Sequence, residues 1–388
     1  MYTKKIKLIV LALLVIATCQ SSYAQVPIKL DDQNLEISGL ISTTYNYRWK
    51  LDPASTNFSK NKFALGNARF SLAGQKGSDY EYKLQMDLSR LGTQDIAGEA
   101  APLMDAYFTY KKWPVDITAG YTKMPYSRSS LMPIKSLPFW QRPEMARGYL
   151  FSRRDIGITL KKKIMNDRIN IMAGVYSGQG EYILTALTGG DADRGGKPEY
   201  VARVEYSFPG KYHYRDVVDF KHVKKIMGAI GINGRYIKRT ETIIDGGDYG
   251  MKNLAGTRKL YGFDVAAQYN GFSILFEMHQ MHITPVDTLL LYGRNTTFFR
   301  AGGIIAQACY YSKKLKSAFL VRYDEFMPND LRANNYRMAN ISFAYNYYFN
   351  NENTAFRIQY WYRLYKDNTM IDNKFREDQL RAGFQFAF

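Results

Sequence analysis

The chain has 388 residues and a formal net charge of +18, and aromatic residues make up 15% of it, while its mean hydropathy is −0.35. This combination argues against a soluble enzyme and favours a β-barrel with one apolar face and one wetted face. No stretch after residue 24 approaches the roughly eighteen uncharged apolar residues of a transmembrane helix, which excludes a helical membrane protein.

The first 24 residues predict a secretory signal peptide. Lysines at positions 4, 5 and 7 precede an uncharged apolar run from Leu8 to Cys19, and small residues occupy positions 22 and 24. This arrangement predicts cleavage after Ala24. We expect residues 25–34 to form a short N-terminal segment and residues 35–388 to form one transmembrane barrel domain. Only Cys309 remains after cleavage, so no internal disulfide is expected.

Sixteen segments alternate apolar and polar residues with a period of two, which predicts strands with one apolar and one polar face. Each is close to the length at which a tilted strand crosses a bilayer. In chain order they are 35–50, 64–74, 80–89, 104–111, 115–122, 155–161, 169–176, 199–208, 226–236, 261–270, 272–279, 300–311, 317–324, 337–349, 354–363 and 379–388. Leu275, Ile305 and Leu320 interrupt the alternation, because they would point toward the polar side.

The connections between these segments alternate in length, long and then short. Asn270-Gly271 suits a two-residue hairpin turn, whereas 209–225 should be short and is not, so we expect a small helix there. Long loops at one end and short turns at the other are typical of outer-membrane barrels. The predicted fold is all-β: a transmembrane antiparallel up-and-down β-barrel of sixteen strands in the bacterial outer membrane, with its third external loop folded inward.

That third loop, residues 123–154, carries seven cations and a single acid, Glu144. Its four prolines exclude a long helix or a central strand, and a long irregular segment of this kind is usually functional. We expect it to line the narrowest part of a pore, where clustered cations favour anions. The candidate constriction residues are Lys123, Arg128, Lys135, Arg142, Arg147, Arg153 and Arg154. Leu131, Phe139 and Trp140 would anchor the loop to the wall.

Two other roles for the loop cations stay open. They could tie the loop to acids of the barrel wall, or face lipopolysaccharide phosphates outside. The polar faces of the strands carry both signs of charge, so many wall arginines should form structural ion pairs. The expected inward cations are Arg48, Arg69, Lys83, Arg203, Arg235, Arg322, Arg357, Arg363 and Arg381, and the expected inward acids are Glu81, Asp87, Asp105, Asp116, Asp155, Glu205, Asp264, Glu277 and Asp324.

Five motifs, at 105–110, 119–127, 137–143, 152–158 and 174–180, resemble the phosphate-selective porin O/P family. The resemblance implies a sixteen-stranded, trimeric outer-membrane porin with inward loops and an arginine-lined pore. Arg142, Arg153 and Arg154 lie within the matching motifs, whereas Arg128, Lys135 and Arg147 lie between them. The last motif reads Ser177-Gly178 where the family usually has Asn-Gly.

The predicted function is passive diffusion of small anionic or polar solutes, without enzymatic activity. The alternative is a plugged structural or adhesive barrel without significant conductance. An outer-membrane lipase would need a Ser/His pair, but His279 is expected inward near Glu277 as a satisfied lumen residue. No His/Cys/Asp set has metal-ligand spacing, so no cofactor is expected. Besides solutes, the expected partners are outer-membrane lipid, lipopolysaccharide and further copies in a homotrimer, but not nucleic acid.

Overall fold

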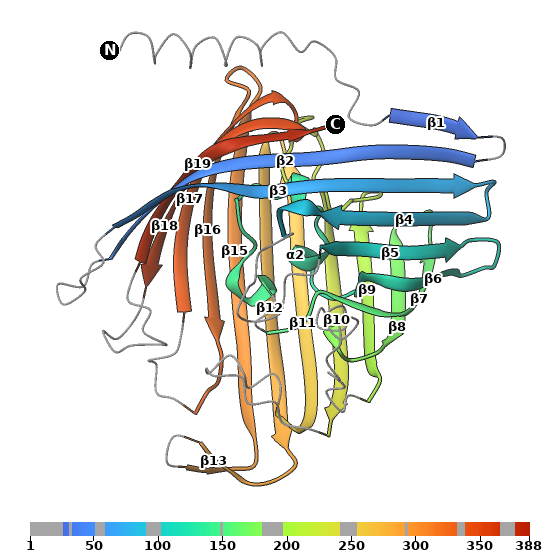
Figure 1. Cartoon of the computed structure of the whole chain (residues 1–388), viewed down its shortest axis with the longest axis vertical. Helices are drawn as coiled ribbons and strands as arrows, with labels where there is room; N and C mark the ends of the chain where they lie inside the picture. The colour runs from blue at the N-terminus through green and yellow to red at the C-terminus, as the bar shows by residue number, and fades with distance from the viewer. Residues whose placement is uncertain are drawn as a thin grey trace.

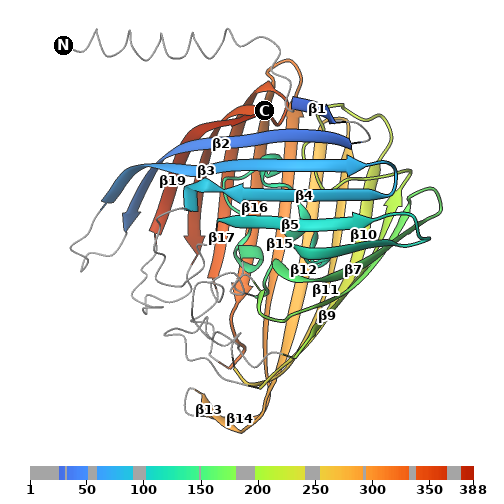
Figure 2. The same ribbon diagram turned by 45° about the vertical axis from the view of Figure 1, so that its right-hand side comes forward.

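The computed structural model describes residues 26–30, 33–50, 59–90, 102–147, 150–180, 197–240, 254–291, 294–331, 338–364 and 377–388. Sixteen of its strands form one antiparallel sheet that closes into a barrel (Figures 1 and 2). The closing pair is β19 with β2, in register from Glu377 opposite Lys50 to Ala387 opposite Leu40. The predicted cleavage after Ala24 lies outside the described residues.

The barrel strands are β2 (Gln33–Lys50), β3 (Ser59–Lys76), β4 (Tyr80–Asp87), β5 (Leu103–Tyr110), β6 (Asp116–Lys123), β7 (Arg154–Ile164), β8 (Ile169–Tyr176), β9 (Glu199–Phe208), β10 (Met227–Arg239), β11 (Gly256–Tyr269), β12 (Phe272–Pro285), β15 (Phe299–Ser312), β16 (Ser317–Met327), β17 (Met338–Asn350), β18 (Thr354–Leu364) and β19 (Glu377–Ala387). Each corresponds to one of the sixteen predicted segments, so the predicted antiparallel β-barrel of sixteen strands is confirmed.

Three further strands lie outside this ring. The N-terminal segment 25–34, expected to precede the first strand, contributes β1 (Val26–Leu30) and the start of β2, and the two pair with each other. The connection between β12 and β15 contains a small hairpin of β13 (Leu289–Leu291) and β14 (Arg294–Thr296), seen at the foot of Figure 1. The alternation of apolar and polar residues did not indicate either feature.

Most barrel strands have an apolar face exposed at the molecular surface and a more polar face buried within the molecule. On β12, Phe276 and Met278 are exposed, whereas Glu277 and His279 are buried. Consecutive strand residues point to opposite faces, so the alternation in the sequence becomes a two-sided wall. The lipid-facing side of a transmembrane barrel has this apolar character.

Leu275, Ile305 and Leu320 lie on the buried face, as the broken alternation predicted. Each belongs to an apolar cluster that includes residues from the connections between strands: Leu275 with Tyr212, Ile305 with Met145, and Leu320 with Phe139. The breaks in the polar face therefore mark the places where connecting segments pack against the wall.

The turn at Asn270-Gly271 is confirmed as a two-residue hairpin between β11 and β12, with Tyr269 paired to Phe272. Both turn residues have positive φ, 47° and 89°, which matches the twist of the flanking strands.

The expectation of a small helix in 209–225 is wrong, because this connection consists of turns and bends. Asp219 explains part of the difference. Its carboxylate accepts the backbone N–H of Val223, at 3.0 Å, and of Gly271, at 2.8 Å, so a side chain takes the place of helical backbone acceptors.

The helices among the described residues are short: η1 (Leu88–Arg90), α2 (Arg128–Leu131), η2 (Ile134–Ser136) and η3 (Glu144–Arg147). Among the described residues, no helix combines the length and the hydrophobicity needed to cross a membrane.

Candidate functional site

The segment between β6 and β7, residues 124–153, is described except for 148–149; we call it the β6–β7 segment. Its described helices have at most four residues, in accord with the prolines that exclude a long helix. Ser127 caps α2 by accepting the N–H of Ser130 at 3.4 Å and has a positive φ of 62°. A non-glycine residue keeps such a backbone conformation only where its surroundings hold it.

Glu277 of β12 holds the start of this segment. Its carboxylate accepts hydrogen bonds from Ser127 Oγ at 2.7 Å, from Ser129 N at 2.6 Å and from Ser129 Oγ at 2.5 Å. His279 Nε2 lies 3.1 Å from the same carboxylate, and His279 Nδ1 lies 3.2 Å from Tyr126 Oη. His279 is thus satisfied by its neighbours, as expected. The carboxylate, rather than the imidazole, contacts the serines, so these residues lack the nucleophile–base contact of a serine hydrolase.

The middle of the segment is fastened to the far wall through its backbone. Arg357 Nη1 of β18 donates to Leu137 O at 2.7 Å, and Asn346 Nδ2 of β17 donates to Pro138 O at 2.8 Å. Arg322 Nη1 of β16 donates to Gln141 O at 3.0 Å. A carbonyl without a regular secondary structure needs such a donor when it is buried. Wall arginines that the sequence placed inward therefore serve to hold this segment.

Aromatic side chains strengthen the same attachment, as expected for Phe139 and Trp140. Phe139 is buried against Leu320, and the Arg322 guanidinium lies 4.3 Å from its ring centroid. Arg357 lies over the Trp140 ring at 5.6 Å. Cation–π contacts of this kind gain strength when both groups are desolvated.

The connection between β9 and β10, residues 209–226, meets the β6–β7 segment; we call it the β9–β10 segment. Tyr212 and Tyr214 each place a ring centroid 5.0 Å from the Arg128 guanidinium, and His213 O accepts from Arg128 at 3.4 Å. Val217 packs with Leu137 in one buried apolar cluster. Only the unusual length of this connection in the sequence hinted at such a role.

The predicted constriction residues divide into groups, and Arg128 and Arg154 form ion pairs with wall acids. Arg128 lies 3.2 Å from Glu205 and 3.4 Å from Asp264, and Arg203 pairs with the same two carboxylates. The two positive charges of these arginines balance the two negative charges of the acids. Arg154 Nε lies 2.9 Å from Asp105. Their geometry matches the alternative in which loop cations tie the segment to the wall.

Lys135 is partly exposed and reaches Glu352 at 3.9 Å, while its carbonyl accepts from Arg357 and from Gln385. Arg153 is half-buried, and its carbonyl accepts the N–H of Met124 at 3.0 Å. The side chain of Arg147 lies outside the described residues.

Lys123 and Arg142 differ from the rest. Lys123 Nζ donates to Leu131 O at 3.0 Å and to Met132 O at 2.8 Å. Arg142 Nη2 donates to the same Met132 O at 2.7 Å, and its Nη1 donates to Ser129 O. Within the described part of the chain, no carboxylate lies within ion-pair distance of either cation.

We call Lys123, Arg142, Arg153 and Arg154 the cationic cluster. Arg154 stands opposite Lys123 in the β6–β7 pairing. Burial lowers the pKa of the Arg142 guanidinium well below its usual range, and the neighbouring charges of Arg153 and Arg154 lower it further. Asp105, the acid that pairs with Arg154, is shared with Lys83 at 3.2 Å. Among the described residues, Lys123 and Arg142 therefore contribute positive charge that no ion pair balances, and a bound anion would stabilise it.

The family model of phosphate-selective porin O and P matches residues 34–245 of this chain. No curated protein matches the chain. Among solved structures, the anion-selective porin from Comamonas acidovorans is 11% identical, with a TM-score of 0.62 and coverage of 92% of this chain and 100% of that chain. OmpF of Salmonella typhi, in a complex with daunomycin, is 12% identical, with a TM-score of 0.61 and coverage of 94% and 100%.

The trimer form of OmpT, an outer membrane protein of Vibrio cholerae, is 11% identical, with a TM-score of 0.56 and coverage of 92% and 100%. At these identities, the solved structures show that the chain shares the porin fold, and the motifs around the cationic cluster lie inside the region that the family model matches. Because that region covers more than half of the chain, the protein belongs to the phosphate-selective porin O and P family.

Proposed function

We propose that this outer-membrane porin lets small anions diffuse passively, with the β6–β7 segment folded into the lumen as a constriction. The segment bonds to buried side chains of β12, β16, β17 and β18, all on the face opposite the exposed apolar one. Figure 1 draws α2 amid the strands of the barrel. In a membrane the apolar face meets lipid, so a segment packed on the other face lies in the lumen.

The observation that carries the anion preference is the shared acceptor of Lys123 and Arg142. Two cations that converge on one carbonyl, without a described carboxylate within ion-pair distance of either, produce a positive field that no described ion pair neutralises. Such a field lowers the barrier for anions and raises it for cations. The guanidinium of Arg142 also suits the planar, forked geometry of phosphate or carboxylate oxygens.

Arg128 has a different role in this proposal. Its charge is balanced by Glu205 and Asp264, and two tyrosine rings flank it. It locks the β6–β7 segment to the wall and to the β9–β10 segment, so it positions the constriction instead of lining it.

The alternative of a plugged barrel has its own support in the β9–β10 segment. This second connection also packs on the buried face, where Val218 joins Phe139 in one apolar cluster. Two segments therefore occupy the interior, and the passage is narrower than the sheet alone would leave. A channel and a plug differ in one measurable respect, which is conductance.

Recording from single barrels in a planar bilayer across a KCl gradient tests the proposal. We expect discrete conductance steps, a reversal potential of anion-selective sign, and a reduced chloride current when phosphate is added. A cation-selective reversal potential would refute the cationic constriction. Absence of any conductance would favour the plugged barrel.

The family resemblance implies a homotrimer, and we propose that assembly for this chain. The trimer form of Vibrio cholerae OmpT shows that a barrel of the same fold can assemble in this way. Cross-linking of the protein in vesicles, followed by electrophoresis without heating, would give a trimer band, whereas a monomer band alone would oppose it.

A further inference from the structure

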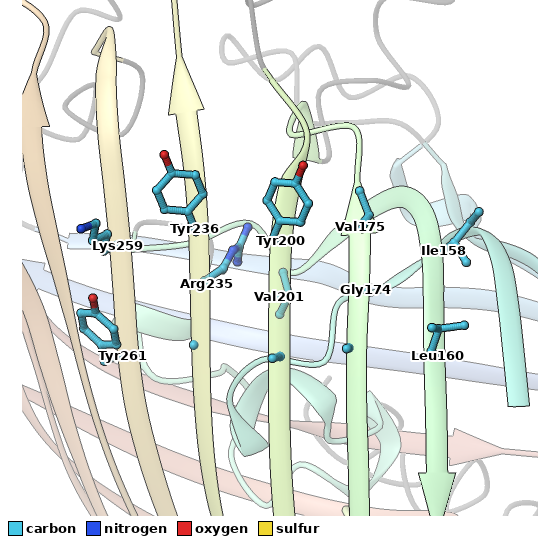
Figure 3. A pocket seen from close by; sticks show the side chains of 13 residues that line it. Ile158, Leu160, Gly174, Val175, Tyr200, Val201, Arg235, Tyr236, Lys259 and Tyr261 are labelled. Carbon is cyan, nitrogen blue, oxygen red and sulfur yellow. The ribbon is translucent and has the colours of Figure 1, made fainter. Parts of the chain in front are cut away.

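A hollow of about 720 Å³ lies on the exposed side of the sheet, across β7 to β11 (Figure 3). It is separate from the cationic cluster, because none of the four cluster residues lines it and most of its lining side chains are exposed on the apolar face. Its walls are mainly aliphatic and aromatic, with Ile158, Leu160, Val175, Tyr200, Tyr236 and Tyr261 around it.

The strand register explains why the surface is hollowed here. Ala173 stands opposite Ala202, which in turn stands opposite Gly234, so three small residues follow one another across the sheet. Leu160 and Tyr261 close the two ends of this row. Each small residue leaves space that a large side chain fills elsewhere on the apolar face, and together they form a trough.

The side chains in the next row, toward the ends of these strands, are larger and more polar. Val175, Tyr200, Tyr236 and Lys259 stand side by side in it. In Figure 3 the rings of Tyr200 and Tyr236 and the amine of Lys259 lie along one edge of the hollow. Tyrosines in such a row are typical of the level where hydrocarbon meets lipid headgroups.

Lys259 on β11 lines this edge, and Lys238 follows Tyr236 by two residues on β10; both lysines are exposed. No carboxylate lies within ion-pair distance of either lysine in the part of the chain that the structure describes. The outward positions of β7–β12 hold no acidic residue, because the acids of these strands, such as Asp264, lie on the buried face. The edge therefore presents positive charge above an apolar trough.

We propose that the hollow binds one acyl chain of an anionic, phosphate-bearing lipid, with the headgroup phosphate held by Lys238 and Lys259. An acyl chain matches the apolar walls and fills the row of small residues. A phosphate matches two lysines that have no carboxylate within ion-pair distance among the described residues. The site thus orders a lipid against the barrel at the end where β10 passes into its long connection.

A second copy of the chain would fit this surface less well. The outward face of β7–β12 offers no described acid to pair with these lysines, so a copy that met this surface with the same face would bring only like charges to it. Lipid phosphate supplies the missing negative charge.

The test uses the full barrel reconstituted in vesicles of equal parts dioleoylphosphatidylglycerol and dioleoylphosphatidylcholine, then transferred to mild detergent. Native mass spectrometry counts the lipids that each barrel retains. We expect phosphatidylglycerol to be retained in preference to phosphatidylcholine. The double variant K238Q/K259Q should lower that preference roughly tenfold or more, whereas K162Q, on the same apolar side near the other end of β7, should not.

A second variant fills the trough. A Cβ at Gly234 would meet nothing closer than Leu260 O, at 3.9 Å, so Gly234→Leu should fold and should abolish retention of the lipid. Ala306→Leu, an exposed position on β15, is the matched control and should retain it. Unchanged retention in Gly234→Leu, or equal retention of the two lipids by the unmodified barrel, would overturn the proposal. So would efficient cross-linking between copies through Val175→Cys.

Discussion

Lys123 and Arg142 donate to the same oxygen, the carbonyl of Met132, at 2.8 and 2.7 Å. One residue ends β6 and the other lies in the middle of the β6–β7 segment, so this shared acceptor brings two cations within two hydrogen-bond lengths of each other. Like charges at that separation repel. A site of this kind favours an anion over a cation, and the first prediction tests that directly.

Replacing Arg142 with glutamine should reduce the anion preference. One unit charge at about 4 Å contributes about 1 kcal/mol even in bulk water, so the anion-to-cation permeability ratio should fall about fivefold. The measurement is the reversal potential in a KCl gradient. Lys238→Gln removes a charge from the outside of the barrel and should leave the ratio unchanged. An unaltered ratio in Arg142→Gln would assign Arg142 a structural role only.

Replacing Arg128 with methionine should affect stability more than selectivity. Removal of one partner from a buried ionic network typically costs about 3–5 kcal/mol, because Glu205 and Asp264 would share only Arg203. Urea unfolding of the folded barrel in detergent measures the loss of stability. Arg128→Lys keeps the charge but not the planar guanidinium, so it should lose less stability than Arg128→Met. A drop in anion selectivity as large as that of Arg142→Gln would instead place Arg128 in the pore lining.

Glu277 and Ser129 should be energetically coupled. The Glu277 carboxylate accepts from both the amide and the hydroxyl of Ser129, at 2.6 and 2.5 Å. Unfolding of Glu277→Gln, Ser129→Ala and the double variant should give a coupling energy on the order of 1 kcal/mol. The single variants should also show noisier open-channel current, because α2 loses part of its attachment. If the stability losses of the two single variants simply add in the double variant, the contact between Glu277 and Ser129 does not hold the β6–β7 segment.

Shortening the β9–β10 segment should raise conductance. Tyr212 and Val217 belong to a buried cluster with Leu137 of the β6–β7 segment, so replacing residues 211–222 with a short glycine-asparagine turn should widen the passage. Single-channel conductance measures the change. A deletion of equal length within residues 181–193, between β8 and β9, serves as the control. If only the shortened β9–β10 variant conducts, the native barrel is plugged.

The sequence alone determined the sixteen strands and their closure. Strand geometry has a period of two, so each strand's local sequence records which side is apolar. The positions of Leu275, Ile305 and Leu320 also showed where that rule breaks. The motifs between 105 and 180 indicated the family. They lie inside the region that the family model matches.

Tertiary structure alone decided which cations of the β6–β7 segment are neutralised. Arg128 meets Asp264 and Arg154 meets Asp105 across many intervening residues, and a sequence pattern does not encode such pairings. The same holds for the inward packing of the β9–β10 segment and for the row Ala173, Ala202 and Gly234. These depend on the register between strands, which brings together residues that are distant along the chain.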